Sequence, residues 1–197
     1  SRGLIDCDCL QRKCEQSGKQ RQQTQYGYGN RQFENTDSLF LKKRRVIDKG
    51  NTEVVAEYIK EMTGADVFRI MPDKEYEKIQ DYDELVELTR IEHENDERPT
   101  FNGKINDIGK YDTIFIGSPI WWYTFPQVMY TFLDSYDLNG KTIIPFTTHE
   151  GSGLADVVEV LRKYYPNATV AEGLAIRGRD AVKSKEKVVR WLEKTGF

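Results

Sequence analysis

The stretch that most constrains the fold of this 197-residue chain runs from Tyr111 to Phe125, with the sequence YDTIFIGSPIWWYTF. Its first half, residues 113–116, is apolar and rich in β-branched residues, without alternating polar positions. This pattern is typical of a strand that is buried on both faces of a parallel sheet. The small residues and the proline at 117–119 then end the strand.

Three large aromatic residues follow this strand directly: Trp121, Trp122 and Tyr123. Adjacent residues in a loop cannot all point into the core. We therefore expect at least one ring at the carboxyl end of the strand, where open α/β sheets bind ligands. A flat ring beside exposed backbone can form a wall for a flat conjugated ligand. The alternative is that both tryptophans only fill the core or an interface.

The remaining apolar pattern alternates between the periods of strands and helices. Strands are expected at 37–41, 65–70, 113–116, 141–147 and 168–176, and helices at 51–63, 83–94, 127–134, 154–161 and 181–194. The charged run EHENDER, residues 92–98, is expected to be a solvated surface. Such alternation predicts an α/β fold with a doubly wound parallel sheet and helices on both of its faces, because crossovers between parallel strands are right-handed.

Three loops follow the carboxyl ends of expected strands, and in a doubly wound sheet these ends share one edge. Residues 50–52 open a helix, where backbone N–H groups and the helix dipole favour a phosphate. Residues 118–123 offer aromatic walls, and residues 147–153 offer hydroxyls, His149 and glycines that permit close backbone approach. A phosphate-binding helix start next to loops with aromatic side chains suggests that the ligand is a mononucleotide with a conjugated ring, such as a flavin.

Composition excludes some classes of protein. Residues 1–45 hold ten Lys and Arg against five Asp and Glu, whereas residues 46–197 hold nineteen against twenty-seven, so the folded part is acidic. Nucleic-acid binding by that part is not expected, since it would need a basic surface. No apolar run approaches the length of about 18 residues that a membrane span needs. We expect a cytoplasmic location, with a removed signal peptide or lipoprotein anchor left open.

The first 33 residues are polar and rich in Gln, Arg and Gly, without a helical or strand period. We interpret residues 1–33 as a disordered tail and residues 34–197 as the folded domain. All three cysteines, at positions 7, 9 and 14, fall in that tail. Their spacing lacks a fourth metal ligand, so we expect unpaired thiols and no metal site.

From residue 46 onward, the chain resembles the flavodoxin-like family, specifically short bacterial flavodoxins and FMN-dependent NAD(P)H:quinone reductases. The likeness is carried by GNTEVVAEYI, YDTIFIGSPIWW and IIPFTTHEGSGL. It implies a five-stranded parallel sheet in the order 2-1-3-4-5 and FMN bound without a covalent link.

By position in these motifs, the first loop would hold the phosphate, while the second and third would flank the isoalloxazine ring. The candidate cofactor-binding residues are Gly50, Asn51, Thr52, Ser118, Pro119, Ile120, Trp121, Trp122, Tyr123, Thr148, His149, Glu150, Gly151, Ser152 and Gly153. No catalytic acid or base is assigned, although His149 or Tyr123 could assist proton transfer.

The chain departs from the family pattern at its first strand, which in the family ends in Tyr-Phe-Ser. The matching place here reads ENTDSLFLKKRR, with Leu41 near the position of that Ser. A one-nucleotide shift of the codons for residues 34–43 permits Lys-Ile-Leu-Ile-Ala-Tyr-Phe-Ser-Arg. We therefore hypothesise that residues 1–45 are an out-of-frame translation. The coding DNA tests this, because a shifted frame without such a strand would end the hypothesis.

The resemblance implies an FMN-binding redox protein that transfers electrons through the flavin. One alternative is an NAD(P)H-dependent FMN or quinone reductase, and another is a flavodoxin-like domain that has lost FMN through its altered first strand and phosphate loop. The expected partner is a redox protein or a small-molecule electron acceptor, and the expected assembly is a monomer or a homodimer.

Overall fold

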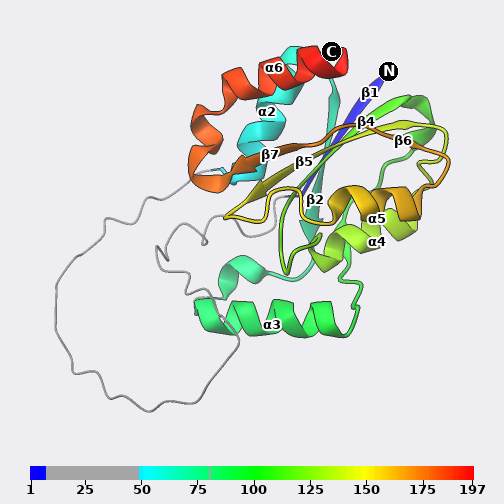
Figure 1. The fold of residues 1–197 in the computed structure, drawn as a ribbon. Coiled ribbons are helices and arrows are strands. Elements are labelled where there is room, and N and C mark those ends of the chain that lie inside the picture. The colour runs from blue at the N-terminus through cyan, green and yellow to red at the C-terminus, as the bar shows by residue number, and fades with distance from the viewer. Residues whose placement is uncertain (8–48, 80) are drawn as a thin grey trace.

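The computed structural model describes residues 1–7, 49–79 and 81–197, which form one twisted sheet between two layers of helices (Figure 1). The strands are β1 (Arg2–Cys7), β2 (Asp66–Pro72), β3 (Phe101–Asn102), β4 (Thr113–Pro119), β5 (Thr142–His149), β6 (Thr169–Val170) and β7 (Leu174–Arg177). The α-helices are α2 (Asn51–Thr63), α3 (Tyr82–Glu94), α4 (Gln127–Ser135), α5 (Val157–Tyr164) and α6 (Lys185–Thr195). Short 3₁₀ turns are η1 (Tyr76–Lys78), η2 (Ile108–Lys110) and η3 (Gly178–Lys183).

The strand order is β3-β2-β1-β4-β5-β6, with β7 also pairing β5. Apart from the antiparallel β2–β3 pair, all neighbours are parallel. The predicted order 2-1-3-4-5 is confirmed if β6 and β7 are counted as one fifth strand, and β3 is a two-residue addition at the far edge.

The fifth strand is split because of Pro145 in β5. The Ala171 N–H donates a hydrogen bond to the Ile143 carbonyl, so the backbone N–H and C=O groups of every second residue of β5, counted from Ile143, point toward β6 and β7. Pro145 is one of these residues, and it has no N–H to donate. Pairing therefore stops after Val170 and resumes at Leu174.

The first strand is not where the sequence analysis placed it. Residues 2–7, which were assigned to the tail, form the central strand β1 between β2 and β4, with Leu4 and Ile5 buried. The tail interpretation is therefore wrong for these residues, and the expectation of unpaired thiols is wrong at Cys7, which is disulfide-bonded. Residues 8–33, the strand expected at 37–41 and residues 8–45 of the proposed out-of-frame segment lie outside the described residues, whereas its first seven residues include β1.

Alternating side chains of the sheet fill two cores. Leu4, Phe115 and Ile144 pack with α2 and α6 on one face, whereas Ile5 and Ile116 belong to the core under α4 and α5 on the other. Figure 1 shows the two pairs of helices on opposite faces of the sheet, as predicted. Among the described helices, none combines the length and the apolar character that a membrane crossing requires.

Helix α3 belongs to neither layer and lies beyond the carboxyl end of β2 (Figure 1). It packs through Leu85 on Tyr76, and the partly buried Trp121 joins the same small cluster. Glu92 of α3 is 1% exposed and accepts hydrogen bonds from the Tyr76 hydroxyl and from Lys74. The expectation that the charged run beginning at residue 92 is wholly solvated is therefore wrong at Glu92.

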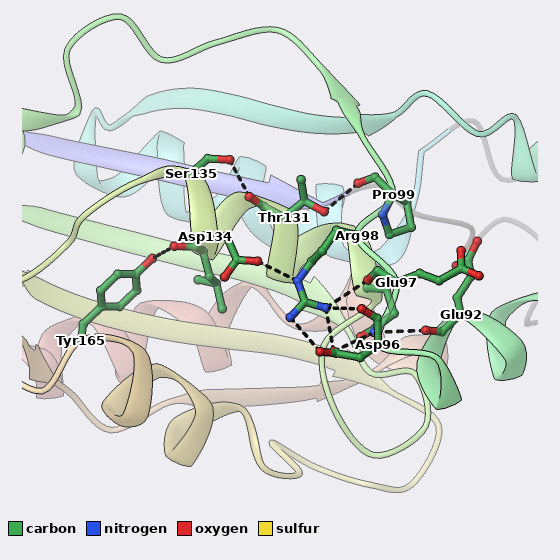
Figure 2. Close-up of polar contacts among 11 residues, drawn as sticks. Glu92, Asp96, Glu97, Arg98, Pro99, Thr131, Asp134, Ser135 and Tyr165 are labelled. Carbon is green, nitrogen blue, oxygen red and sulfur yellow. Dashed lines mark hydrogen bonds and ion pairs between the residues drawn. The ribbon is translucent and has the colours of Figure 1, made fainter.

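Arg98 links the segment after α3 to α4 through hydrogen bonds, as Figure 2 shows. Its Nε donates to Asp134 of α4 at 2.7 Å, and its Nη1 donates to Asp96 at 2.6 Å. Thr131 of α4 donates to the Pro99 carbonyl at 2.8 Å in the same region. These contacts hold α3 at a fixed place relative to the sheet, next to the loop that follows β4.

The central position of β1 can be tested with Leu4→Ala. Because Leu4 is completely buried, we expect the free energy of unfolding to fall by about 2–5 kcal/mol in chemical denaturation. Val182→Ala is the control, since that side chain is 68% exposed and its truncation should change stability by only about 0.5 kcal/mol. Equal effects of the two variants would contradict the placement of residues 2–7 in the sheet.

Candidate functional site

The three loops singled out in the sequence meet at the carboxyl edge of the sheet. The hydroxyls of Thr52 and Thr148 lie 2.6 Å apart, which joins the start of α2 to the end of β5. The Ile120 N–H donates to the Thr148 carbonyl at 3.0 Å, which joins the loop after β4 to β5. The expected convergence of these segments is therefore present in the structure.

The start of α2 has the features of an anion-binding helix terminus. Its N-cap is Gly50, which has no side chain to accept hydrogen bonds from the first turn. Asn51 and Thr52 are buried at 3% and 1% exposure, and the Thr52–Thr148 hydroxyl pair lies beside them. The helix dipole and these polar groups suit a phosphate.

Two carboxylates near this helix start were not anticipated from the sequence. Glu53 in the first turn of α2 pairs with Arg69 of β2 at 2.8 Å. The fully buried Asp6 of β1 lies 3.7 Å from the Arg69 Nε. Lys49, just before the helix, also interacts with Glu53, so charges of both signs lie beside the helix start. Only the position of residues 2–7 in the sheet brings this group together, so local motifs could not reveal it.

The aromatic loop contains a tight and strained turn. Trp121 and Thr124 exchange backbone hydrogen bonds of 3.0 and 2.9 Å around the two residues between them. Those residues, Trp122 and Tyr123, have φ angles of 52° and 63°. Left-handed backbone costs a residue with a Cβ roughly 1–2 kcal/mol. Strained backbone of this kind is more frequent at functional sites than elsewhere in proteins.

The turn directs its three rings into different surroundings. Trp121 packs edge to face on Tyr76, with ring centroids 5.9 Å apart. Trp122 is 39% exposed and donates its indole N–H to the Thr89 hydroxyl of α3 at 3.2 Å. Tyr123 is 77% exposed. The expectation that at least one ring lies outside the core is confirmed.

Other candidates in this loop are enclosed. Ser118 is fully buried, and its hydroxyl donates to the Pro119 carbonyl at 2.8 Å. Pro119 is also buried, so Ile120 is the first residue of the loop with partial exposure. The Ser118 side chain therefore already has a partner within the protein.

The loop after β5 is closed by Thr147, which donates to the Gly153 carbonyl at 2.9 Å. Glu150 and Gly151 are exposed, while Ser152 and Gly153 are partly buried. Gly178, which sequence analysis missed, lies against this loop. A Cβ on Gly178 would be 2.7 Å from both the Asn51 amide nitrogen and a Glu150 carboxylate oxygen. The end of β7 thus approaches the start of α2 through a residue that has no side chain.

His149 ends β5 and is half-buried. Its Nδ1 is buried and has no hydrogen-bond partner among the described residues. Burial lowers the imidazole pKa from its usual value, and the positive charges of Arg177 and Lys187 lower it further. The neutral form of His149 is therefore favoured near neutral pH.

The fold is that of a doubly wound α/β protein with a candidate ligand site at the carboxyl edge. A sequence profile of the flavodoxin family matches residues 46–195. The chain therefore belongs to the flavodoxin family. The matched region excludes β1, in agreement with the departure from the family pattern at the front of the chain.

Solved structures show the same fold. A protein assigned as a flavoprotein from Bacteroides eggerthii is 30% identical, with a TM-score of 0.64 over 75% of this chain and 91% of that one. A protein from Bacteroides uniformis with the same assignment is 30% identical, with a TM-score of 0.63 over 72% of this chain and 90% of that one. A flavoprotein from Lactobacillus acidophilus, solved in complex with FMN, has 20% identity and a TM-score of 0.52, covering 68% and 90%. The search of curated proteins gives no match.

The environment of His149 predicts an acid-sensitive contribution to stability. The pKa of His149 in the folded protein lies below the usual 6.5, so the unfolded chain binds this proton more readily. The free energy of unfolding should therefore fall as the pH drops from above 6.5 through the pKa of the folded state. An NMR titration of the two histidines should give a His149 midpoint below 6.5, with signals assigned by His93→Gln. A His149 midpoint at or above 6.5 would contradict the described environment.

Proposed function

We propose that this protein binds FMN without a covalent link at the carboxyl edge of the sheet and transfers electrons through it. The observation that carries the proposal is that three loops meet around the hydroxyl groups of Thr52 and Thr148. The oxygen atoms of these two hydroxyls lie 2.6 Å apart. The loops combine an uncapped helix start with an exposed aromatic turn at one edge. The FMN-bound flavoprotein from Lactobacillus acidophilus has a similar fold and supports the choice of flavin.

Each segment has a separate task in this proposal. The N–H groups at the start of α2, with the polar side chains of Asn51 and Thr52, hold the phosphate. Trp122 and Tyr123 form an aromatic wall for the isoalloxazine ring, and residues 148–153 bound its other side. The flavin supplies the redox chemistry, and the protein binds and orients it. Where the acceptor is a protein, the acidic domain suits a basic partner.

The net charge of the domain should tune the cofactor. Residues 46–197 hold twenty-seven Asp and Glu against nineteen Lys and Arg. Negative charge disfavours the anionic reduced form of a flavin and so lowers its reduction potential.

A second candidate function is a flavodoxin-like domain without FMN. The observation that favours it is the length of chain before the proposed phosphate site. The 43 residues 8–50 separate β1 from α2, whereas the loop between a strand and the next helix in an α/β unit is usually about 2–6 residues long. If the phosphate cannot be held, the domain would bind other partners or none.

An FMN titration of the full chain decides between the two functions. We expect quenching of free FMN fluorescence and a saturable flavin absorbance band on the protein, with affinity that weakens in high salt because the phosphate site is electrostatic. Riboflavin, which lacks the phosphate, is the matched control and should bind more weakly. A protein that leaves FMN fluorescence unchanged at all salt concentrations would support the second function.

Substitution of the two tryptophans should separate binding from stability. Stacking on an aromatic ring is worth about 1–3 kcal/mol, so Trp122→Ala should weaken FMN roughly 5- to 150-fold. Trp121→Ala should instead lower the free energy of unfolding by about 2–3 kcal/mol, since that ring packs on Tyr76. Calorimetry and thermal denaturation measure the two effects. Unchanged FMN affinity in both variants would refute the aromatic wall.

A further inference from the structure

Helix α3 reaches the aromatic turn through the side chain of Thr89. Its hydroxyl oxygen accepts a hydrogen bond from the indole N–H of Trp122 at 3.2 Å. The same hydroxyl donates to the Val86 carbonyl, one turn earlier in the helix, at 3.1 Å. Since a hydroxyl has one proton and two lone pairs, both hydrogen bonds can form at once. The helix carbonyl thus orients the hydroxyl so that a lone pair is left for the indole.

Thr89 lies in the middle of the buried face of α3. The buried residues of this helix are Leu85, Thr89 and Glu92, which follow one another at helical spacing. Leu85 packs on Tyr76, and Glu92 accepts a hydrogen bond from the Tyr76 hydroxyl. Threonine is a weaker helix former than straight-chain residues are, so the helix itself gives no reason for a hydroxyl at position 89. The hydrogen bond to Trp122 gives one.

The last turn of α3 is itself held in place, so the Thr89 hydroxyl has a defined position. The Glu92 carboxylate accepts a hydrogen bond from Lys74 at 2.5 Å, and Gln127 of α4 donates its amide N–H to the Glu92 carbonyl at 3.2 Å. Arg98 links the segment after the helix to α4 (Figure 2). A side chain on this helix is therefore a rigid support for a ring in the neighbouring loop.

The backbone of the aromatic turn is fixed by its own hydrogen bonds, whereas the ring of Trp122 needs a further restraint. Backbone hydrogen bonds between Trp121 and Thr124 close the turn, and Trp122 adopts a φ of 52° within it. Trp122 is 39% exposed, so packing restrains its ring less than it would in a core. The hydrogen bond from its indole nitrogen to Thr89 restricts both side-chain dihedral angles. Fixing a ring before the ligand arrives lowers the entropy cost of binding.

We propose that Thr89 is a positioning residue of the flavin site, which holds the indole of Trp122 in the orientation that contacts the isoalloxazine ring. This inference rests on the proposed flavin function, because Trp122 is part of the aromatic wall proposed there. Thr89 acts through Trp122 and not through a contact of its own with the flavin. Helix α3, which belongs to neither helix layer (Figure 1), thereby contributes to the affinity of the site.

NMR of the full chain without FMN tests the contact itself. The chain has three tryptophans, Trp121, Trp122 and Trp191, and Trp122→Phe assigns the indole N–H signal of Trp122. Thr89→Val, which replaces the hydroxyl by a methyl group of similar size, should shift that signal and speed its exchange with water. The Trp191 indole N–H, which donates to the Glu172 carbonyl at 3.0 Å, is the internal reference and should not change. An unchanged Trp122 signal would overturn the proposal.

FMN affinity tests the positioning role. Loss of the hydrogen bond in Thr89→Val should weaken FMN about 2- to 12-fold, and riboflavin by the same factor, because both ligands carry the isoalloxazine ring. Thr89→Ser keeps the hydroxyl and should bind FMN as the unaltered protein does. Thr195→Val is the matched control, since that hydroxyl also donates to a carbonyl of its own helix, that of Leu192, at 3.0 Å. This control should leave FMN affinity unchanged, and thermal denaturation checks that all variants fold.

A double-mutant cycle shows whether Thr89 acts through Trp122 or through the stability of α3. Trp122→Phe keeps a ring but has no N–H, so adding Thr89→Val to this variant should weaken FMN no further. The same loss of affinity in both backgrounds, or in Thr195→Val, would overturn the positioning role. FMN binding that does not depend on the Thr89 hydroxyl would refute only this inference, whereas a chain that binds no FMN would refute the flavin function and this role with it.

Discussion

The backbone hydrogen bonds on both sides of β1 are the constraint on which the structure depends. Residues 3–7 pair with β2 and residues 2–6 pair with β4, so six residues join the two halves of the sheet. Without these residues, β2 and β3 would no longer be joined to β4, and α2 would lose its contacts with β1. Leu4 and Ile5 also contribute to both cores. The geometry of the candidate site is therefore set by a short segment that is distant from it in sequence.

Most of the fold could be predicted because long apolar strands and amphipathic helices have clear periods. The segments around β4, β5, α2 and α4 are of this kind, and the order of the parallel strands is confirmed. The strand β1 was missed because RGLIDC is short and contains Arg2, Gly3 and Asp6, which weaken a buried-strand pattern. The division of the last strand depends on which way Pro145 faces, and that requires the sheet register.

The candidate site could be predicted only where a local motif marked it. Three loops stood out through their glycines, hydroxyls and aromatic residues, and the structure brings these loops together. Arg69, Arg177 and Gly178 carry no motif, because each acts through a neighbour from a distant part of the chain. Their importance follows from tertiary contacts, which periodicity and spacing do not encode.

The turn between Trp121 and Thr124 has a consequence for how this protein can change. Asparagine and glycine adopt positive φ at lower cost than aromatic residues do, so Asn-Gly at positions 122 and 123 would relax the backbone. It would also remove both exposed rings from the carboxyl edge. Selection for thermostability alone would favour that exchange, while selection for ligand binding would oppose it. The backbone cost of this turn is therefore the cost of keeping both aromatic rings at the carboxyl edge.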